Sequence, residues 1–194
     1  MPRKKILSSK SQIVDVALAL IESEGLEAVS MRRLSKEMDV SNKTLYNYVL
    51  NADEVLREIL IRSFTGVYEQ VFAKTQELVA QGLDAPIAYA KAYALVLYSF
   101  ACSKKDICDY LLGPGYEAYH NDAELRHLFD PFGDIVLAME SRGDISRLKK
   151  IFQLYEGALL SQIRNHISGV RVLDPAQFEE TVDLLIELMF DTKV

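Results

Sequence analysis

Residues that interrupt helices are scarce in this sequence. Its 194 residues include only 5 prolines and 9 glycines, whereas hydrophobic residues make up 49% of the chain. Many apolar residues with few helix breakers favour packed helices, and a chain of this length can bury a substantial core. We therefore expect an all-α fold.

Cysteines and long apolar runs are also scarce. The two cysteines, Cys102 and Cys108, have no metal-ligand spacing with each other or with histidine, which indicates unpaired thiols in a reducing compartment. The longest apolar run covers the eleven residues from Ala92 to Cys102, whereas a bilayer crossing needs about 20. Polar residues 8–12 stand where a signal peptide would have its apolar segment. The sequence thus predicts a cytoplasmic protein with a buried core helix and no membrane partner.

Motifs for catalysis or metal binding are few. We find no Gly-rich phosphate loop, nucleophile elbow or Cys/His catalytic spacing. Glu124 and His127 have the Glu-x-x-His spacing of di-iron helical bundles, and His120 lies seven residues before His127. That architecture also requires a second such motif and two more inward carboxylates, which the sequence does not supply. We predict no enzyme, no metal site and no cofactor, and keep a carboxylate-His metalloenzyme as the last alternative.

Negative charge dominates the chain as a whole but not its beginning. The formal net charge is −6, yet residues 1–50 contain eight Lys or Arg against six Asp or Glu, a net of +2, and residues 51–194 carry −8. The first periodic segment is preceded by four basic residues, Arg3, Lys4, Lys5 and Lys10. They form either a solvated tail or a basic arm that contacts phosphates or the minor groove. The split indicates a mildly basic head on an acidic body.

Residues 30–56 have the pattern of two short helices joined by a tight turn, with a third helix beginning after them. The N-cap signals are Ser30, Ser41, and Asn51 or Asp53. Asp39 is the expected corner residue, because Asp tolerates the left-handed backbone conformation that such a corner often needs. The two short helices are expected to share a seam made by Leu34, Met38, Val40, Leu45 and Val49. The pattern is typical of a DNA-reading unit whose second helix presents its beginning to the outside.

Apolar periodicity predicts further helices on both sides of this stretch. The first runs from a Ser11 cap to Gly25, and a long helix of about 25 residues begins at Asp53. Asp84 and Pro86 begin a core helix over 87–102, and residues 103–145 are broken into short pieces. Two amphipathic helices close the chain, one from Ile145 or Ser146 to Ser168 and one from an Asp174 cap to Asp191.

In this order the elements resemble the tetracycline-repressor (TetR) family of bacterial transcriptional regulators. The resemblance covers residues 10–56 and is carried by the first helix ending in Glu24-Gly25, the Met31 to Met38 helix, the Val40-Ser41 turn, Thr44-Leu45-Tyr46, and Asn51 to Leu56. It implies a helix-turn-helix DNA-binding domain with a basic arm over residues 1–52. A helical effector-binding and dimerisation domain would follow over residues 53–194, joined to the head by the long helix.

The resemblance also implies which residues contact DNA. They are Arg32, Ser41, Asn42, Lys43, Thr44, Tyr46, Asn47 and Tyr48. Their chemistry agrees, because Asn suits an adenine edge, Lys suits guanine, and the hydroxyls of Thr44 and Tyr48 can donate to phosphate oxygens. The Tyr46 ring either contacts DNA or mainly packs.

The sequence departs from the family's pattern at three positions. Asp39 stands where the family often has Gly, and Lys43 where it often has Gly or Pro. Ala52 stands where the family usually has a Lys that contacts phosphate, and the loss of one such contact should lower the salt slope of DNA binding by about 0.9. Lys43, Arg32, Arg33 or the basic arm could compensate.

For the body, the resemblance implies a small-molecule pocket and a dimer interface. Aromatic residues are numerous enough to line a pocket, although aromatics at helical spacing are more often core. The candidate effector-binding residues are Tyr93, Tyr116, His120, Phe132 and Tyr155. The surplus apolar positions of the last two helices fit an isologous four-helix contact between two copies. The candidate interface residues are Phe152, Leu159, Ile163, Ile167, Phe178, Val182, Leu185 and Met189.

The predicted function is sequence-specific transcriptional regulation by a homodimer on double-stranded DNA. Two heads held about 34 Å apart would read a palindromic operator, and a small-molecule effector would release the repressor from it. The alternative is the same head with a body that senses a protein partner or no ligand.

Overall fold

The computed structural model describes residues 7–115, 119, 121–125 and 145–190, leaving aside the side chains of residues 145, 147, 148, 189 and 190. Every regular element in these ranges is helical, which confirms the predicted all-α class. The chain divides into two compact units, Met1–Ser63 and Phe64–Val194. The division falls after Ser63, inside the long helix α4 (Ala52–Ala80), and so further along the chain than residue 52, near which the sequence predicts a boundary inside a helix.

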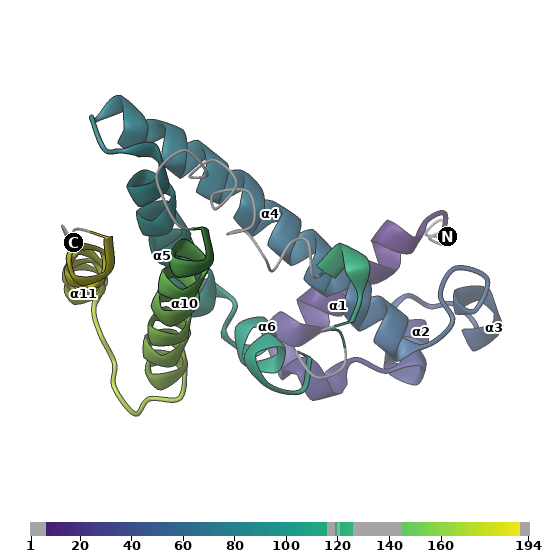
Figure 1. Ribbon diagram of the computed structural model, residues 1–194. Coiled ribbons are helices and arrows are strands. Elements are labelled where there is room, and N and C mark those ends of the chain that lie inside the picture. The colour runs from purple at the N-terminus through teal and green to yellow at the C-terminus, as the bar shows by residue number, and fades with distance from the viewer. Residues whose placement is uncertain (1–6, 116–118, 120, 126–144, 191–194) are drawn as a thin grey trace. The chain divides into compact units, whose positions relative to one another are not determined.

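The first unit contains α1 (Lys10–Glu24), the 3-10 helix η1 (Leu26–Ala28), α2 (Met31–Glu37), α3 (Asn42–Leu45) and the first turns of α4 (Figure 1). Within it, α1 packs against η1 and α2, and α2 packs against α3. Its core includes Ile13, Val14, Ala17, Leu20, Ile21, Leu34, Leu45, Val49, Val55, Ile59 and Leu60. Full burial of one Leu or Ile side chain contributes about 1.5–3 kcal/mol, so this apolar cluster is the main force that holds the short helices in place.

Side-chain caps fix where the helices of the first unit begin. Ser30 Oγ accepts a hydrogen bond from the backbone N–H of Arg33 at 3.2 Å, and Asn51 Oδ1 accepts one from Glu54 at 2.8 Å. Both confirm predicted N-caps. The first helix differs from expectation, because Ser9 rather than Ser11 is its cap. Gly25 ends that helix at a φ of 85°, a backbone conformation that favours glycine.

The second unit contains the rest of α4 and α5 (Ala85–Ser103), α6 (Lys105–Tyr110), the π-helical turn η2 (Leu111–Gly115), α10 (Ile145–Ile167) and α11 (Pro175–Phe190). α5 packs against both α10 and α11, which also pack against each other (Figure 1). The α11 cap confirms the prediction, since Asp174 Oδ1 accepts from Gln177 N and Gln177 Oε1 accepts from Asp174 N. Asp84 stands at the N-cap position of α5 but makes no capping hydrogen bond with its side chain.

α5 is the predicted core helix. Its length and hydropathy would allow a membrane crossing, the only described helix with that property, but half of its apolar window is buried. Its buried residues include four alanines, at positions 88, 90, 92 and 94, that let α10 and α11 approach closely. The alanine-rich surface therefore fits a helix packed between helices.

Polar contacts hold α10 and α11 onto α5. The Tyr155 hydroxyl donates to the Ala90 carbonyl at 2.8 Å, and the Tyr98 hydroxyl donates to the Leu173 carbonyl at 2.5 Å. Burial, and then the hydrogen bond with Cys102, raise the pKa of Tyr98 to about 12, so this hydroxyl keeps its proton at neutral pH. Lys91 Nζ lies 3.0 Å from Glu179 Oε1 and 2.7 Å from Asp183 Oδ1.

The candidate dimer residues lie mainly inside a single chain. Phe152, Leu159, Ile163, Ile167, Phe178 and Val182 are at most 3% exposed. Leu185 is half-buried, and the side chain of Met189 lies outside the described residues. The six buried side chains have no surface to offer a partner, because they form the core beside α5. Among the described side chains of α10 and α11, the large apolar ones that are exposed are instead Leu154, Leu184 and Leu188.

Candidate nucleic-acid interface

A left-handed corner at Asp39 joins α2 to α3. Its φ is 52°, and it is the one non-glycine residue with positive φ in the described chain. Around it, Met38 N donates to Leu34 O at 3.0 Å and Val40 N donates to Ser35 O at 3.0 Å. Asp39 is thus the corner residue that the sequence predicts, and the turn needs no glycine.

Ser41 fixes the beginning of α3. Its Oγ accepts from the backbone N–H of Thr44 at 3.1 Å and lies 2.9 Å from Thr44 Oγ1. The regular helix is a single turn that continues as looser turns, in which Tyr48 N and Val49 N both bond to Leu45 O. Asn, Thr, Tyr and Val have modest helix propensities, which explains why the helix does not extend further.

Burial divides this segment into an anchored side and an open side. Leu45 is 0% exposed and Val49 2%, so both fasten the segment to the core of the first unit. Asn42, Lys43 and Asn47 are exposed, and Tyr46 is 53% exposed. The structure therefore brings together on the surface the amide and ammonium groups that sequence reasoning selected for base edges. The exposure of Tyr46 favours the contact role of its ring over packing.

Tyr48 has a different environment from the one expected. Its side chain is half-buried, and its hydroxyl donates to the backbone carbonyl of Leu7 at 3.0 Å. A phenol has one proton, so a hydroxyl bound to Leu7 has none left for a phosphate oxygen. Sequence reasoning missed this contact because its partners are 41 residues apart.

The basic side chains of the head differ in their exposure and in their ion pairs. Arg33 Nη2 lies 2.5 Å from Glu24 Oε1 and 3.5 Å from Glu37 Oε2, so its guanidinium pairs with two carboxylates of the first unit. Arg32, Lys36 and Lys43 are exposed. Lys36 was not among the predicted DNA-binding residues, although its spacing of four from Arg32 places both on one helix face.

Lys10 belongs to α1 and not to a free basic arm. Its Nζ lies 2.6 Å from Glu54 Oε1 and 3.1 Å from Glu58 Oε1 on α4. The other oxygen of Glu54 accepts from Leu50 N at 2.6 Å. The hydrogen bonds from Lys10 and then from Leu50 lower the pKa of Glu54, and those to Glu54 and Glu58 raise the pKa of Lys10. This contact fixes the beginning of α4, the position of Ala52, against α1.

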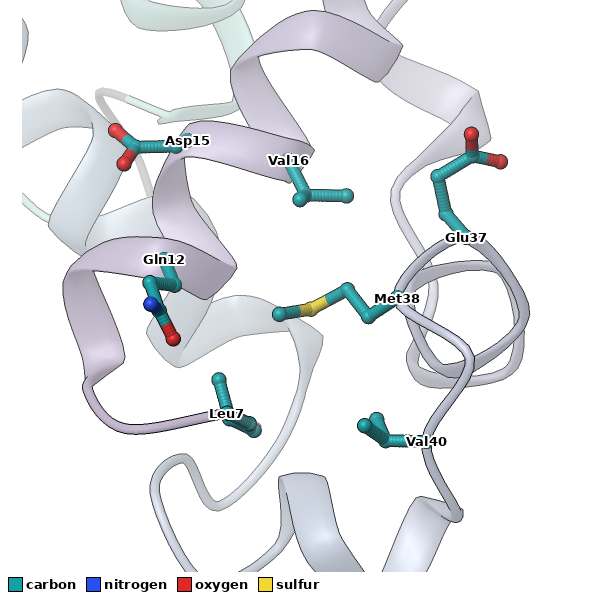
Figure 2. Close-up of a pocket in the computed structure, with 7 residues that line it drawn as sticks. All are labelled: Leu7, Gln12, Asp15, Val16, Glu37, Met38 and Val40. Atoms are coloured by element: carbon teal, nitrogen blue, oxygen red, sulfur yellow. The ribbon is translucent and has the colours of Figure 1, made fainter. Parts of the chain in front are cut away.

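A small cavity lies behind the turn, between α1 and the end of α2 (Figure 2). Its volume is about 180 Å³. Figure 2 shows the Met38 side chain extending toward α1, with Leu7 and Val40 below it and the carboxylates of Asp15 and Glu37 directed away from the gap. Met38 and Val40, predicted for the α2/α3 seam, thus also line this cavity together with Leu7.

Two of the five candidate effector-binding residues lie in the described part of the body. Tyr93 is 9% exposed and Tyr155 is 0% exposed. Burial raises the pKa of both phenols. Because the Tyr155 hydroxyl donates to Ala90, it serves the core of the body. Tyr116, His120 and Phe132 lie outside the described residues, as does His127 of the metal alternative. The described residues hold no cluster of three or more His, Cys, Asp or Glu suited to a metal ion.

Comparisons with known proteins identify the head and the fold. Residues 13–59 match the model of the tetR family of bacterial regulatory proteins. The chain is 31% identical over 85 residues to the HTH-type transcriptional regulator YobS of Bacillus subtilis (strain 168), a match that covers 44% of each protein. The chain thus spans less than half the length of the curated relatives it matches.

Two solved structures share the fold over nearly the whole chain. The fatty acid degradation regulator FadR from Bacillus halodurans has a TM-score of 0.66 and 16% identity, with 98% of this chain and 99% of that chain covered. Thermus thermophilus FadR, a TetR family transcriptional repressor solved in complex with lauroyl-CoA, has a TM-score of 0.58 and 20% identity, with 95% of both chains covered. The match over residues 13–59 covers the helix-turn-helix described above, so this part of the chain is similar to the tetR family of bacterial regulatory proteins.

Proposed function

We propose that this protein is a transcriptional repressor that binds a palindromic DNA operator as a homodimer and leaves it when the body binds a small molecule. The observation that carries the proposal is the open side of the α3 segment. Asn42, Lys43 and Asn47 are all exposed on a segment that buried Leu45 anchors to the core of the first unit. Amides and ammonium groups are the side chains that discriminate adenine and guanine in the major groove.

Charge supports the same surface. Arg32 and Lys36 on α2 and Lys43 on α3 are exposed cations that can neutralise phosphates on either side of the bases read by α3. In this proposal they supply the attraction that the family draws from a Lys at the position of Ala52. Each phosphate contact should contribute about 0.9 to the salt slope of binding.

The proposed dimer uses the side chains that α10 and α11 leave exposed. Leu154 is 66%, Leu184 54% and Leu188 62% exposed, and Leu184 and Leu188 are one helical turn apart. Apolar side chains of this size at the surface favour burial against a second copy. A dimer places two heads on one duplex, as a palindrome requires.

The proposed effector is a small molecule that binds to the body. The proposed site of action is the cytoplasm. Because a solved neighbour was crystallised with lauroyl-CoA, that acyl thioester is the first compound to test. To change operator occupancy from nearly full to nearly empty, an effector must bind the released state about 10⁴-fold more tightly than the DNA-bound state.

The experiment is selection of duplexes from a random pool by the full-length wild-type chain. We expect enrichment of a palindrome whose half-sites lie about one helical turn apart, bound by two chains per duplex. Lauroyl-CoA is then added to the complex, with free coenzyme A as the control, to test release. Absence of any enriched sequence at low salt would overturn the proposed DNA-binding function.

A further inference from the structure

We propose that Cys102 and His166 form a reactive thiol–imidazole pair at which low-molecular-weight disulfides modify the protein. The pair lies in the second unit, where the end of α5 meets the end of α10. The inference goes beyond the proposed function, because it assigns a modification site to the body, and it holds whether or not the head binds DNA.

The two cysteines of the chain differ in exposure. Cys102 is exposed, whereas Cys108 is 1% exposed. Burial raises the pKa of the Cys108 thiol to about 12, so this residue keeps its proton at neutral pH. Because the thiolate is the attacking form of a cysteine, Cys102 is the one that a dissolved disulfide can reach and react with.

A ring nitrogen of His166 lies beside the Cys102 sulfur. Cys102 Sγ and His166 Nε2 are 3.4 Å apart, within hydrogen-bond distance for a sulfur atom. The other ring nitrogen, Nδ1, accepts a hydrogen bond from Leu173 N at 3.3 Å. A nitrogen that accepts has no proton, so the proton of the neutral ring is on Nε2 and is directed at the sulfur.

Neighbouring rings hold the imidazole in this orientation. The centroids of the Tyr98 and His166 rings are 4.9 Å apart, with the two planes at 62°. The Tyr98 ring in turn stacks on Phe178 with centroids 4.1 Å apart. The N–H group of His166 is therefore in place before the sulfur becomes negatively charged, and a hydrogen bond to a charged atom is stronger than one to a neutral atom.

The proposed reaction is thiol–disulfide exchange. The Cys102 thiolate attacks one sulfur of the dissolved disulfide, a new Sγ–S bond forms and the original S–S bond breaks. The electron pair of the broken bond leaves with the second sulfur as a thiolate, and the proton that Cys102 lost goes to solvent. The disulfide is the only co-reactant, and a free thiol reverses the exchange by the same steps.

The modification should loosen the connection between α10 and α11. Leu173 lies in this connection and is 7% exposed, with its N–H bound by His166 and its carbonyl by Tyr98. A mixed disulfide adds bulk beside His166 Nε2 and leaves no thiolate to accept the ring proton. The ring is displaced, and its hydrogen bond with Leu173 is lost. An oxidised thiol pool thus becomes a second input to the body, besides the proposed effector.

The test follows the reaction of the full-length chain with dithiobis(nitrobenzoate), an aromatic disulfide that releases a coloured thiolate, at one fixed pH. Cys108→Ala leaves Cys102 as the single thiol. Ser103→Cys, combined with Cys102→Ser and Cys108→Ala, is the matched control, because it puts a thiol at the next exposed position of α5. His166→Phe keeps a ring beside Tyr98 but removes both nitrogens, and His166→Gln restores an N–H donor. Circular dichroism checks that each variant remains helical.

We expect one thiol of the wild type to react, and mass spectrometry to locate the adduct at Cys102. It should react at least about tenfold faster than the thiol introduced by Ser103→Cys, the effect of one hydrogen bond to a charged atom. His166→Phe should remove this difference, and His166→Gln should restore part of it. Oxidised glutathione should form the same adduct and lower the melting temperature by about 2–4 °C, and dithiothreitol should reverse both changes.

Two results would overturn the inference. One is a Cys102 thiol that reacts no faster than the thiol introduced by Ser103→Cys. The other is an unchanged or faster reaction in His166→Phe, which would mean that the imidazole only packs over the sulfur and shields it. An adduct that leaves the melting temperature unchanged would contradict the loosened connection. No DNA is present in these measurements, so their outcome is independent of whether the proposed DNA-binding function fails.

Discussion

At the scale of single residues, local chemistry determines the turn that the head depends on. Asp39 adopts a positive φ of 52°, where L-residues other than Asn and Asp are strained. The sequence predicts this residue because the constraint is local. The partner of Tyr48 could not be predicted in the same way, since Leu7 is distant in sequence. The ion pairs of Lys10 and Arg33 likewise depend on which acidic side chains the fold brings near them.

Substitution of Asp39 tests the turn. Asp39→Gly removes the strain that a Cβ atom causes at positive φ, which stabilises the fold, but it also raises the entropy of the unfolded chain, which destabilises the fold. Because the two effects nearly cancel, the free energy of unfolding should change by less than about 1 kcal/mol. Asp39→Val should lose about 2 kcal/mol, because a β-branched residue is disfavoured at positive φ. Urea unfolding of both variants measures the difference. A valine variant as stable as the glycine variant would show that the corner is not strained.

At the scale of elements, sequence signals locate most helix ends correctly. They do not show whether an apolar helix face packs inside the chain or against a second chain. Caps at Ser30, Ser41 and Asp174 are local and are found as predicted. Periodicity identifies the apolar side chains of α10 and α11. Most of the candidate interface residues among them are nevertheless buried in the core, because both helices pack their apolar faces against α5. An apolar stripe alone does not distinguish an internal contact from a contact between chains.

The beginning of α4 should respond to acid through Glu54. Its lowered pKa means that its contribution to stability is present above its ordinary value of 4.5 and is lost as pH falls through the lower folded-state pKa. We expect Glu54→Gln to lower the melting temperature at pH 7 and to reduce its further decline below pH 4.5. Glu69→Gln, at an exposed position of α4, is the control. Parallel acid profiles for Glu54→Gln and wild type would contradict this account.

At the scale of the whole molecule, the chain combines a mildly basic head with an acidic body. The division between its compact units falls after Ser63, beyond the first turns of α4, whose Val55, Ile59 and Leu60 are buried. Composition and periodicity predict the two parts and their fold class. The pairing of α5 with both terminal helices depends on contacts between residues far apart in sequence, which periodicity does not specify.

Dimerisation should depend on the exposed leucines of α11. Leu184→Glu and Leu188→Glu place a charge where we propose a contact between copies, so light scattering should show monomers that keep their helical content and no longer gain stability with protein concentration. Phe72→Glu, at a side chain 59% exposed on α4, should remain dimeric and serves as the control. A wild-type monomer at working concentration, or leucine variants that stay dimeric, would contradict the proposed interface.

The central claim is that the open side of the α3 segment reads bases while cations on α2 contact phosphates. The most direct measurement compares the binding of Lys43→Ala and Arg32→Ala with wild type, on the enriched duplex and on its single-base variants. Lys43→Ala should relax discrimination at one base pair by about 1–3 kcal/mol and leave other positions unchanged. Arg32→Ala should weaken all duplexes equally and lower the salt slope by about 0.9. Uniform weakening by Lys43→Ala, with every base preference intact, would contradict the account.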